Sequence, residues 1–380
     1  MQLDRDALRT AVEARKRQTG MSRLRIRLFD DVVIDFDPAH AERTRSGGFA
    51  LAGRHGEDPA DSVVVVDNDG VVALGAQIRG RRYTLRGSPQ AGYQAAEWPA
   101  APPLPEAAGN DALPLPVQPS PAPGGARSPA RWKAASLLDD GSLIDLMVAY
   151  TPAARVANGG SAQMQANIDA QIAFTNLIYQ NSGVVQRLRL VHVAEIPFVE
   201  DNPFNDLFAV NAPFDGRADE VQVLRDVYRA DLVSFWGAWP ALGGIAYLGT
   251  PEGLSVLPWY AVSILSSPLA TNPTDTTLAH ELGHNMGLRH DLVTEPGSTT
   301  QVTPEGSTTL TTIGYAHGHV DPVNRFRTVM SYPICETQHG YACRLLPLFS
   351  NPTLIHDNRS YYPAAVPAPL GDALLADERR

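Results

Sequence analysis

The chain has 380 residues, enough for two or three folding units with a buried core that does not depend on disulfides. Hydrophobic residues make up 44% and charged residues 19% of it, which is typical of globular proteins and excludes a disordered or fibrous chain. We expect no membrane span, because no apolar run approaches the roughly 20 residues that a spanning helix needs. With 31 basic against 41 acidic side chains the net charge is −10, and no basic cluster follows residue 98, so nucleic acid is not an expected partner.

Residues 1–98 are expected to form a small β-rich domain. A charged helix is predicted over residues 4–17, and β-type runs follow at 24–29, 32–36, 62–66, 71–78 and 83–85. Between the third and fourth runs, Asp67-Asn68-Asp69-Gly70 is a hairpin turn signal. Residues 1–20 lack the apolar run of a signal peptide, so either the protein stays inside the cell or its signal lies outside this numbering.

Residues 99–132 are expected to link two domains. Between Pro99 and Pro129 the sequence holds 10 of the chain's 31 prolines, together with many alanines. This composition predicts an extended, solvated linker that holds no core and is open to cleavage.

Residues 133–363 are expected to form the second domain, followed by a flexible tail at 364–380. Helices are predicted at 162–180 and 220–228, and strands at 144–150, 188–196, 231–236, 244–248 and 259–265. The alternation of strands and helices predicts an α/β layer with a mixed sheet.

The stretch from Thr276 to Asp291 carries the strongest chemical signal. His280 and His284 are four residues apart, so on one helix they lie on the same face and can both bind Zn²⁺. A straight helix would carry His290 to another face, but Gly287 can adopt a positive φ and turn the chain back. We therefore predict three histidine ligands and an open fourth position for water, as in catalytic zinc sites, with three ordinary histidines as the alternative.

Glu281 follows the first of these histidines in the chain. It is expected to take the proton of a zinc-bound water as that water attacks a carbonyl. Leu278, Leu282 and Met286 are expected on the opposite face of the helix, in the core.

The motif His-Glu-x-x-His-x-x-Gly-x-x-His, followed by Asp, resembles the metzincin zinc peptidases, particularly the reprolysin-like branch. Softer motifs are similar to those of bacterial peptidyl-Asp metallopeptidases, and they lie at 144–155, 224–226, 230–233, 244–247 and 349–352. The resemblance implies an α/β (α+β) metzincin-type catalytic domain with a mixed sheet and a zinc helix, preceded by a small β-rich prodomain.

The resemblance also implies roles for residues near the motif. Met330, within residues 327–333, matches the family's Met-turn, where the methionine packs and is not a ligand. Tyr332 is similar to the tyrosine that in some metzincins reaches the zinc or the oxyanion, a buried structural tyrosine being the alternative. Asp291 is expected to orient the neighbouring backbone or a ligand.

An extended substrate is implied to pair with an edge strand above the zinc helix. The candidates for that strand are Gly244, Ile245, Ala246 and Tyr247. An Asp side chain of the substrate would need a cation, because a desolvated carboxylate requires a partner. Arg344 and Arg327 are the candidates, and a surface or structural role is the alternative for each.

The first domain resembles the propeptide of reprolysin-like enzymes around residues 52–58, 61–62, 69–71 and 83–85, which implies a prodomain that inhibits its own enzyme. Many relatives place a propeptide cysteine on the zinc, but no cysteine precedes residue 335 here, so that switch is impossible. The alternatives are an aspartate on the open zinc position, with Asp111, Asp139 and Asp140 as candidates, or a steric block by the prodomain.

The two cysteines, Cys335 and Cys343, are eight residues apart. They predict a local disulfide if the protein reaches an oxidising compartment, two free thiols being the alternative. Together with the resemblance, they predict a secreted or periplasmic protein. His317 and His319 suggest a second metal site, but solvated loop histidines are the simpler interpretation.

These features predict a secreted zinc metalloendopeptidase that is made as a zymogen and hydrolyses internal bonds of proteins or peptides, with cuts before Asp as a finer expectation. One alternative is a broad-specificity peptidase with an apolar pocket. The other is a non-catalytic zinc-bound module that only binds peptides, which the presence of Glu281 disfavours.

Overall fold

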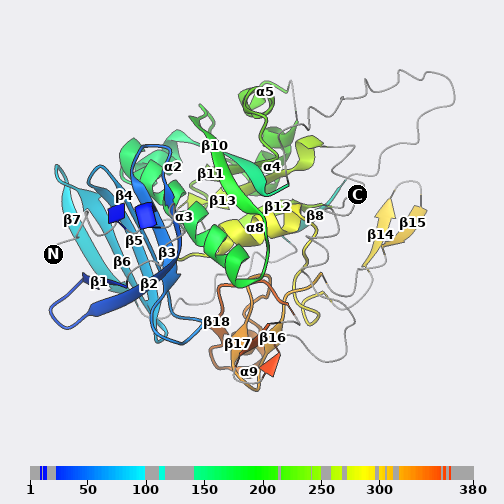
Figure 1. Cartoon of the computed structure of the whole chain (residues 1–380). Coiled ribbons are helices and arrows are strands. Elements are labelled where there is room, and N and C mark those ends of the chain that lie inside the picture. The colour runs from blue at the N-terminus through cyan, green and yellow to red at the C-terminus, as the bar shows by residue number, and fades with distance from the viewer. Residues whose placement is uncertain are drawn as a thin grey trace.

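The computed structural model describes residues 9–10, 12–14, 23–98, 111–115, 141–212, 215–240, 242–249, 258–267, 272–295, 299–303, 306–310, 316–351, 354–356 and 359–360. The predicted tail at 364–380 lies outside these residues, and of the predicted helix over 4–17 only residues 9–10 and 12–14 are described, as helix. Figure 1 shows two units, a sheet of N-terminal strands and a larger mixed unit beside it.

The first unit is a seven-stranded antiparallel sheet in which the strands follow one another in chain order. Its β4–β5 hairpin turns at Asp69 and Gly70, which have φ values of 54° and 91°, so the predicted turn is confirmed. Strands β3 and β7 were not predicted from the sequence. The strands are β1 (Leu24–Arg27), β2 (Val33–Arg43), β3 (Phe49–Arg54), β4 (Ser62–Asn68), β5 (Val71–Ile78), β6 (Arg81–Ser88) and β7 (Gly92–Trp98).

The second unit is built on a six-stranded sheet with the order β10-β9-β11-β13-β12-β8. Strands β10, β9, β11 and β13 are parallel to one another and β12 is antiparallel to β13, so the predicted mixed sheet is confirmed. The strands are β8 (Ala112–Pro114), β9 (Leu143–Tyr150), β10 (Arg187–Glu195), β11 (Leu232–Gly237), β12 (Gly244–Leu248) and β13 (Val262–Ser266). The helices of this part are α2 (Pro152–Ala157), α3 (Ser161–Asn181), α4 (Pro203–Asn211), α5 (Asp219–Tyr228) and α8 (Thr277–Asn285), with a 3₁₀ turn at Pro258–Tyr260.

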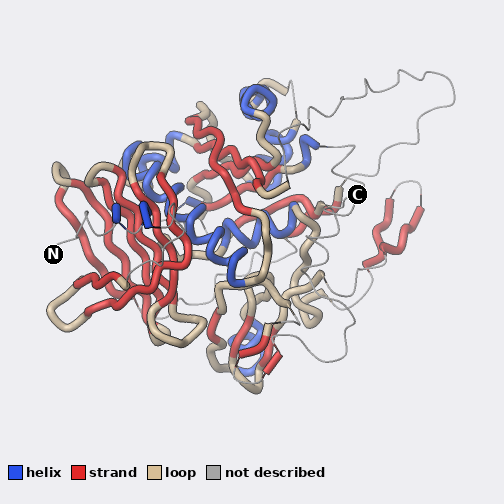
Figure 2. The backbone as a smooth tube through the Cα atoms, viewed as in Figure 1, coloured by secondary structure: helices blue, strands red, loops and turns tan. Residues whose placement is uncertain are grey.

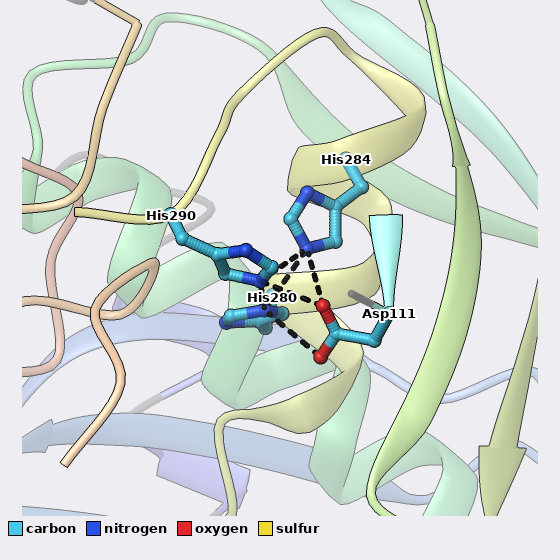
Figure 3. Close-up of side chains that lie close together, drawn as sticks. All are labelled: Asp111, His280, His284 and His290. Carbon is cyan, nitrogen blue, oxygen red and sulfur yellow. Dashed lines mark hydrogen bonds and ion pairs between the residues drawn. The ribbon is translucent and has the colours of Figure 1, made fainter. Parts of the chain in front are cut away.

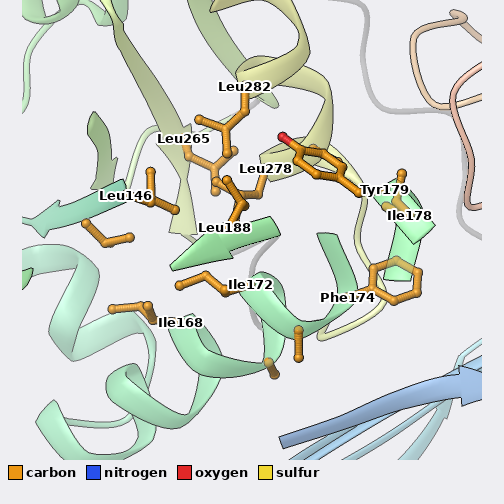
Figure 4. Packing of buried hydrophobic residues seen from close by; sticks show 14 of the residues in the cluster. Leu146, Ile168, Ile172, Phe174, Ile178, Tyr179, Leu188, Leu265, Leu278 and Leu282 are labelled. Carbon is orange, nitrogen blue, oxygen red and sulfur yellow. The ribbon is translucent and has the colours of Figure 1, made fainter. Parts of the chain in front are cut away.

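Helix α3 lies between the two sheets (Figures 1 and 2). It packs on β2 to β5 of the first unit and on β10 and α8 of the second. Gln163, Met164 and every residue from Ala166 to Tyr179 are buried, as expected for a helix that is covered on all sides. Figure 4 shows its residues Ile168 and Ile172 in one cluster with residues of the second sheet and of α8.

The prediction of a solvated linker is wrong for residues 111–115. Strand β8 pairs in parallel with β12 through the partners Ala246 and Ala112, Tyr247 and Leu113, and Leu248 and Pro114. Asp111 and Ala112 are buried, with exposed fractions of 8% and 2%. A proline-rich segment can form an edge strand because its missing N–H groups face away from the sheet. The edge strand predicted at 244–248 is therefore covered by a segment from the linker.

The C-terminal part adds short elements below α8 (Figure 1). Strands β16 (Val320–Asp321), β17 (Phe326–Arg327) and β18 (Arg344–Leu345) form a small sheet next to helix α9 (Ile334–His339). Cys335 and Cys343 form a disulfide there, which confirms the predicted pairing. Two further hairpins are β14 (Thr299–Thr303) with β15 (Gly306–Leu310), and β19 (Ile355–His356) with β20 (Arg359–Ser360). Among the described residues, no helix combines the length and apolar character needed to cross a membrane.

Candidate metal centre

Helix α8 places two histidines on one face. Its first turn is anchored where the Thr277 backbone N–H donates to Asp275 Oδ1 at 2.8 Å. One turn apart, His280 and His284 project from this helix toward the same point (Figure 3), while Leu278 and Leu282 are fully buried in the core. This short helix therefore packs into the core with one face and presents its two histidines on the other.

Gly287 ends this helix and reverses the chain. Its φ is +93°, a value that glycine adopts without strain, and the Leu288 N–H donates back to the Gly283 carbonyl at 2.9 Å. Beyond this turn, the next loop pairs with residues 316–318 through Arg289 and brings His290 opposite the helix.

The three imidazoles converge through their Nε2 atoms. The Nε2–Nε2 distances are 3.0 Å between His280 and His284, 3.1 Å between His284 and His290, and 3.3 Å between His280 and His290. Three nitrogens bound to one tetrahedral zinc at about 2.0–2.1 Å would lie about 3.3 Å apart. The spacing thus fits a single Zn²⁺ ion shared by the three side chains.

Each imidazole is held by its other nitrogen. His280 Nδ1 bonds the Val329 carbonyl at 2.9 Å, His284 Nδ1 bonds the Leu288 carbonyl at 2.7 Å, and His290 Nδ1 bonds Glu295 Oε1 at 2.7 Å. Because each of these acceptors takes a hydrogen bond from Nδ1–H, each imidazole in its neutral form carries its lone pair on Nε2, which points inward as metal ligation demands. The donor set therefore fits zinc.

Asp111 completes the group from the opposite side, on the residue before β8 (Figure 3). Its Oδ1 lies 2.7 Å from His290 Nε2 and 3.4 Å from His284 Nε2, and its Oδ2 lies 3.7 Å from His280 Nε2. All four ligand atoms lie within 4.8 Å of one another. The carboxylate thus faces the position that three histidines alone would leave open.

Electrostatics at this group follow from burial and close charges. Burial opposes ionisation of Asp111, but its hydrogen bonds to His284 and His290 hold its pKa well below the usual range. Burial lowers the pKa of His280 to about 3, with His284 acting in the same direction. Burial also opposes the charge on His290, but Asp111 and Glu295 together raise its pKa to about 9.

Glu281 lies against strand β12. A Cβ on Gly244 would come within 2.5 Å of Glu281 Cγ and 2.6 Å of its Oε1, so only glycine leaves room for this side chain. Glu281 is buried, and its Oε2 has no hydrogen-bond partner among the described residues. Burial and the neighbouring Asp111 charge raise the pKa of Glu281.

The turn around Met330 supports the helix from below. Met330 is fully buried, and a Cβ on Gly283 would lie 2.6 Å from its Sδ, so the helix and the turn approach closely only at glycine. The adjacent Val329 supplies the carbonyl that orients His280. This turn thus touches both the core and the first histidine.

Tyr332 stacks on His290 at 4.2 Å between ring centroids and is held by its backbone N–H, which donates to Asp291 Oδ2 at 3.1 Å. Burial and Asp111 raise the pKa of its phenol. Asp291 also accepts from the backbone of Val293 and Thr294, so it fixes both the 291–294 turn and Tyr332.

The predicted substrate-binding cations lie in two different settings. Arg327 is mostly buried beneath the turn and donates to the Ser331 carbonyl at 2.8 Å, while its Nε has no partner among the described residues. Arg344, half-exposed on β18, forms an ion pair with Asp58 of the first unit. Gly244, Ile245, Ala246 and Tyr247 all lie on β12, which is paired with β8.

Two residues that the sequence did not single out for this role support His290. Glu295 orients its imidazole, and buried His317 bonds its backbone carbonyl through Nδ1 at 2.7 Å. The expectation that His317 is a solvated loop residue is wrong, because it is 1% exposed. Of the other proposed aspartates, Asp139 and Asp140 lie outside the described residues. A carboxylate five residues after a ligand was the available signal for Glu295.

Comparison with known proteins places this geometry in a family. The family model described as Metallo-peptidase family M12 matches residues 141–334, just over half of the chain. The chain belongs to metallo-peptidase family M12. The match covers α8 and the three histidines, and the predicted resemblance to metzincin-like zinc metallopeptidases is confirmed.

Individual relatives of this family M12 chain carry a common name. The peptidyl-Asp metalloendopeptidase of Pseudomonas aeruginosa is 34% identical over 222 residues, which cover 56% of this chain and 35% of that protein. The protein of the same name from Xanthomonas campestris pv. campestris is 27% identical over 238 residues, covering 62% and 48%. The chain thus spans about a third to a half of the length of these relatives. A solved structure of metalloproteinase-II from Bacteroides fragilis matches with a TM-score of 0.42 and 12% identity, covering 91% of this chain and 92% of that one.

Proposed function

We propose that this chain is a secreted, zinc-dependent metalloendopeptidase that is made as a zymogen and cuts internal peptide bonds, with a preference for bonds before Asp. The observation that carries the proposal is the convergence of three imidazole Nε2 atoms whose Nδ1 atoms are all fixed, next to a buried carboxylate on the same helix. A purely structural zinc site would not need Glu281 beside it.

The chemistry divides between the metal and the chain. When bound, Zn²⁺ supplies Lewis-acid polarisation of the scissile carbonyl and makes the attacking water more acidic. Glu281 accepts the proton of that water and passes it to the leaving amine. Tyr332, stacked on His290, donates its phenol proton in a hydrogen bond to the oxygen where negative charge develops.

A digest of a peptide library tests this function most simply. The chain, freed of the segment that carries Asp111, is incubated with and without a zinc chelator, and every cut is mapped by mass spectrometry. Cuts that vanish with the chelator are expected. Glu281→Gln is expected to lower the rate by about 10²–10⁴-fold with unchanged zinc content. A folded, zinc-loaded chain that makes no cuts would contradict the proposal and would favour a peptide-binding module.

Latency is assigned to Asp111. Its carboxylate faces the three Nε2 atoms, so it occupies the position where water and the substrate carbonyl must meet. The contact is made by a side chain and not by a peptide group, so this segment presents no bond for attack. Strand β8 also occupies the hydrogen-bonding edge of β12, which an extended substrate would need.

The latency proposal is tested in the uncut chain. Asp111→Ala removes the carboxylate that faces the imidazoles and weakens the hold of β8 on β12. It is expected to give chelator-sensitive activity without any cleavage of the linker, at a level below that of the cut chain, whereas the wild type stays inactive. Pro114→Ala is the matched control on the same strand, because Pro114 is exposed whereas Asp111 is buried. Equal, negligible activity in the wild type and in a folded Asp111→Ala chain would contradict the role of Asp111 and leave a steric block as the explanation.

The preference for Asp is supported by the name of the curated relatives and by the two arginines near the turn. Arg327 is the better candidate, because its buried Nε has no partner in the part of the chain that the structure describes, whereas Arg344 is already paired with Asp58. Arg327→Lys keeps the charge and Arg327→Gln removes it. The Gln variant is expected to lose the bias for Asp while it still cuts neutral peptides, and the Lys variant is expected to keep part of the bias. An unchanged cut pattern in both would contradict this assignment.

Secretion is supported by the Cys335–Cys343 disulfide, because such bonds persist in oxidising compartments and are rare in the cytosol. The test is localisation of the tagged protein in cell fractions. Recovery from the cytoplasm alone, with both thiols reduced, would contradict it.

A further inference from the structure

The first unit and the second unit, which we call the catalytic unit from here on, share one hydrophobic core. The face of the seven-stranded sheet that meets α3 contributes side chains that are all fully buried, namely Ala50, Ala52, Val64, Val66 and Ala73. These small residues let the sheet approach the helix closely, so the contact resembles the interior of one domain. Separation would expose this face and the matching side of α3 to water.

Buried polar groups cross the same contact. Asn68 Nδ2 donates to Asp169 Oδ2 at 2.6 Å, and Gln163 Nε2 donates to the Val72 carbonyl at 3.0 Å. Gln163 Oε1 also accepts from the Gly87 N–H at 3.1 Å. Separation would leave these buried groups without their partners, which adds a penalty to the loss of apolar contact.

The sheet also contacts the chain that leads into the zinc helix. A Cβ on Gly75 would lie 2.9 Å from Thr274 N and 3.0 Å from Pro273 Cβ, so β5 touches the backbone just before α8. The next step toward the helix is the bond from Asp275 to the first turn of α8. The first unit therefore supports the element that carries His280 and His284.

From these contacts we infer that residues 23–98 stay bound to the catalytic unit after the chain is cut between β8 and β9, as a permanent subunit that is not released. The inference rests on the proposed zymogen function only in assuming that such a cut occurs. Activation then requires Asp111 and β8 to leave β12, while the sheet remains on α3. Arg344 stays paired with Asp58 in the cut protein.

The experiment uses the full chain with a protease recognition sequence inserted between Leu115 and Gly141. After cutting, which a denaturing gel verifies, the native mass is measured by gel filtration with light scattering at about 1 µM and after further dilution. The expected result is one particle with a mass near the 41.0 kDa of the intact chain. Two separate particles would overturn the inference.

Two substitutions test whether the described contact holds the fragments. Asn68→Ala removes a hydrogen bond to a carboxylate, which is expected to weaken the association roughly tenfold to a hundredfold. Gln163→Ala removes two neutral hydrogen bonds across the same contact, to the Val72 carbonyl and from the Gly87 N–H, and is expected to weaken the association in the same direction. This variant lies in the second unit, so it still tests the contact if Asn68→Ala disturbs the first unit. The readout is the urea concentration at which the two fragments separate.

Arg81→Ala is the control, because its exposed ion pair with Glu97 lies within the first unit. It is expected to leave the separation unchanged. If neither Asn68→Ala nor Gln163→Ala differs from this control, the contact with α3 does not hold the fragments and the inference fails. Both readouts, the native mass and the urea concentration of separation, are independent of activity. A stable but inactive complex would therefore refute the peptidase proposal and leave this inference intact.

Discussion

Helix α8 and the segment that carries Asp111 and β8 reach the same site by different routes. In residues 276–291 the ligands, the turn glycine and Glu281 are fixed relative to one another by helical spacing and one reversal at Gly287. Asp111 reaches the same point from a segment more than 150 residues earlier, held by its pairing with β12. Contacts that depend on local spacing can be predicted from the sequence, whereas the pairing of a distant segment such as β8 with β12 cannot.

Loss of a histidine ligand is expected to give the largest effect. It tests whether the locally spaced histidines of residues 276–291 form the metal site. His284→Ala removes one of the three converging nitrogens, so zinc affinity should fall by more than the 10–100-fold typical of an outer partner. The measurement is zinc content by mass spectrometry after dialysis against a weak chelator. Retention of one zinc per chain would show that the triad is not the metal site.

The next effect is expected at Gly244 on strand β12. Gly244→Ala places a Cβ within 2.6 Å of Glu281 Oε1, so this carboxylate must move. A displacement near 1 Å is expected to lower kcat by about a hundredfold in the activated enzyme. Zinc content is the control and should not change. Full activity would show that the position of Glu281 is not critical.

A smaller effect is expected one layer away from the metal. Glu295→Gln replaces the carboxylate that accepts from His290 Nδ1, which should weaken zinc binding roughly 10–100-fold. Competition with a chromophoric chelator measures it. This variant tests a residue that lies only five positions after His290 in the sequence, yet was recognised only from the structure. An unchanged affinity would show that its hydrogen bond does not support the metal site.

A further effect is a pH dependence at the contact between the two units. Burial raises the pKa of Asp169 to about 6, with Glu42 acting in the same direction and the hydrogen bonds from Asn68 and Gln165 opposing it. Since the folded pKa lies above the unfolded value of about 3.9, the folded state binds the proton more tightly. Stability from this group is thus fully present below about pH 4 and is lost as pH rises through about 6.

Over that range the free energy of unfolding is expected to fall by up to about 3 kcal/mol through this group. Urea unfolding at several pH values measures the change. Asp169→Asn removes the titrating group and should flatten the profile relative to the wild type. A profile that is identical in both proteins would show that Asp169 does not titrate as described.

Most of the fold could be predicted from patterns of short range. The strands at 71–78 and 244–248 and the helix at 162–180 were predicted within a residue of their limits, because apolar periodicity and turn residues specify them locally. The helix at 203–211 was missed, since its short sequence carries two exposed phenylalanines that obscure the amphipathic pattern.

The site was only partly predictable for the same reason. His280, His284 and His290 lie close together in the sequence, at a spacing that is typical of zinc ligands. These three residues could therefore be predicted from the sequence. Asp111 was one of three aspartates named as candidates, and its own surroundings predicted a solvated linker. Asp111 reaches the histidines because the strand that follows it pairs with β12. This pairing cannot be predicted from residues 99–132 alone.

A crystal structure of the uncut, zinc-loaded chain, with anomalous scattering at the zinc edge, tests the central claim most directly. The account predicts one zinc bound by Nε2 of His280, His284 and His290, with an Asp111 carboxylate oxygen at about 2.0–2.2 Å as the fourth ligand. Zinc at these histidines with water in the fourth position and Asp111 elsewhere would contradict the role of Asp111. A zinc bound elsewhere in the chain would contradict the site itself.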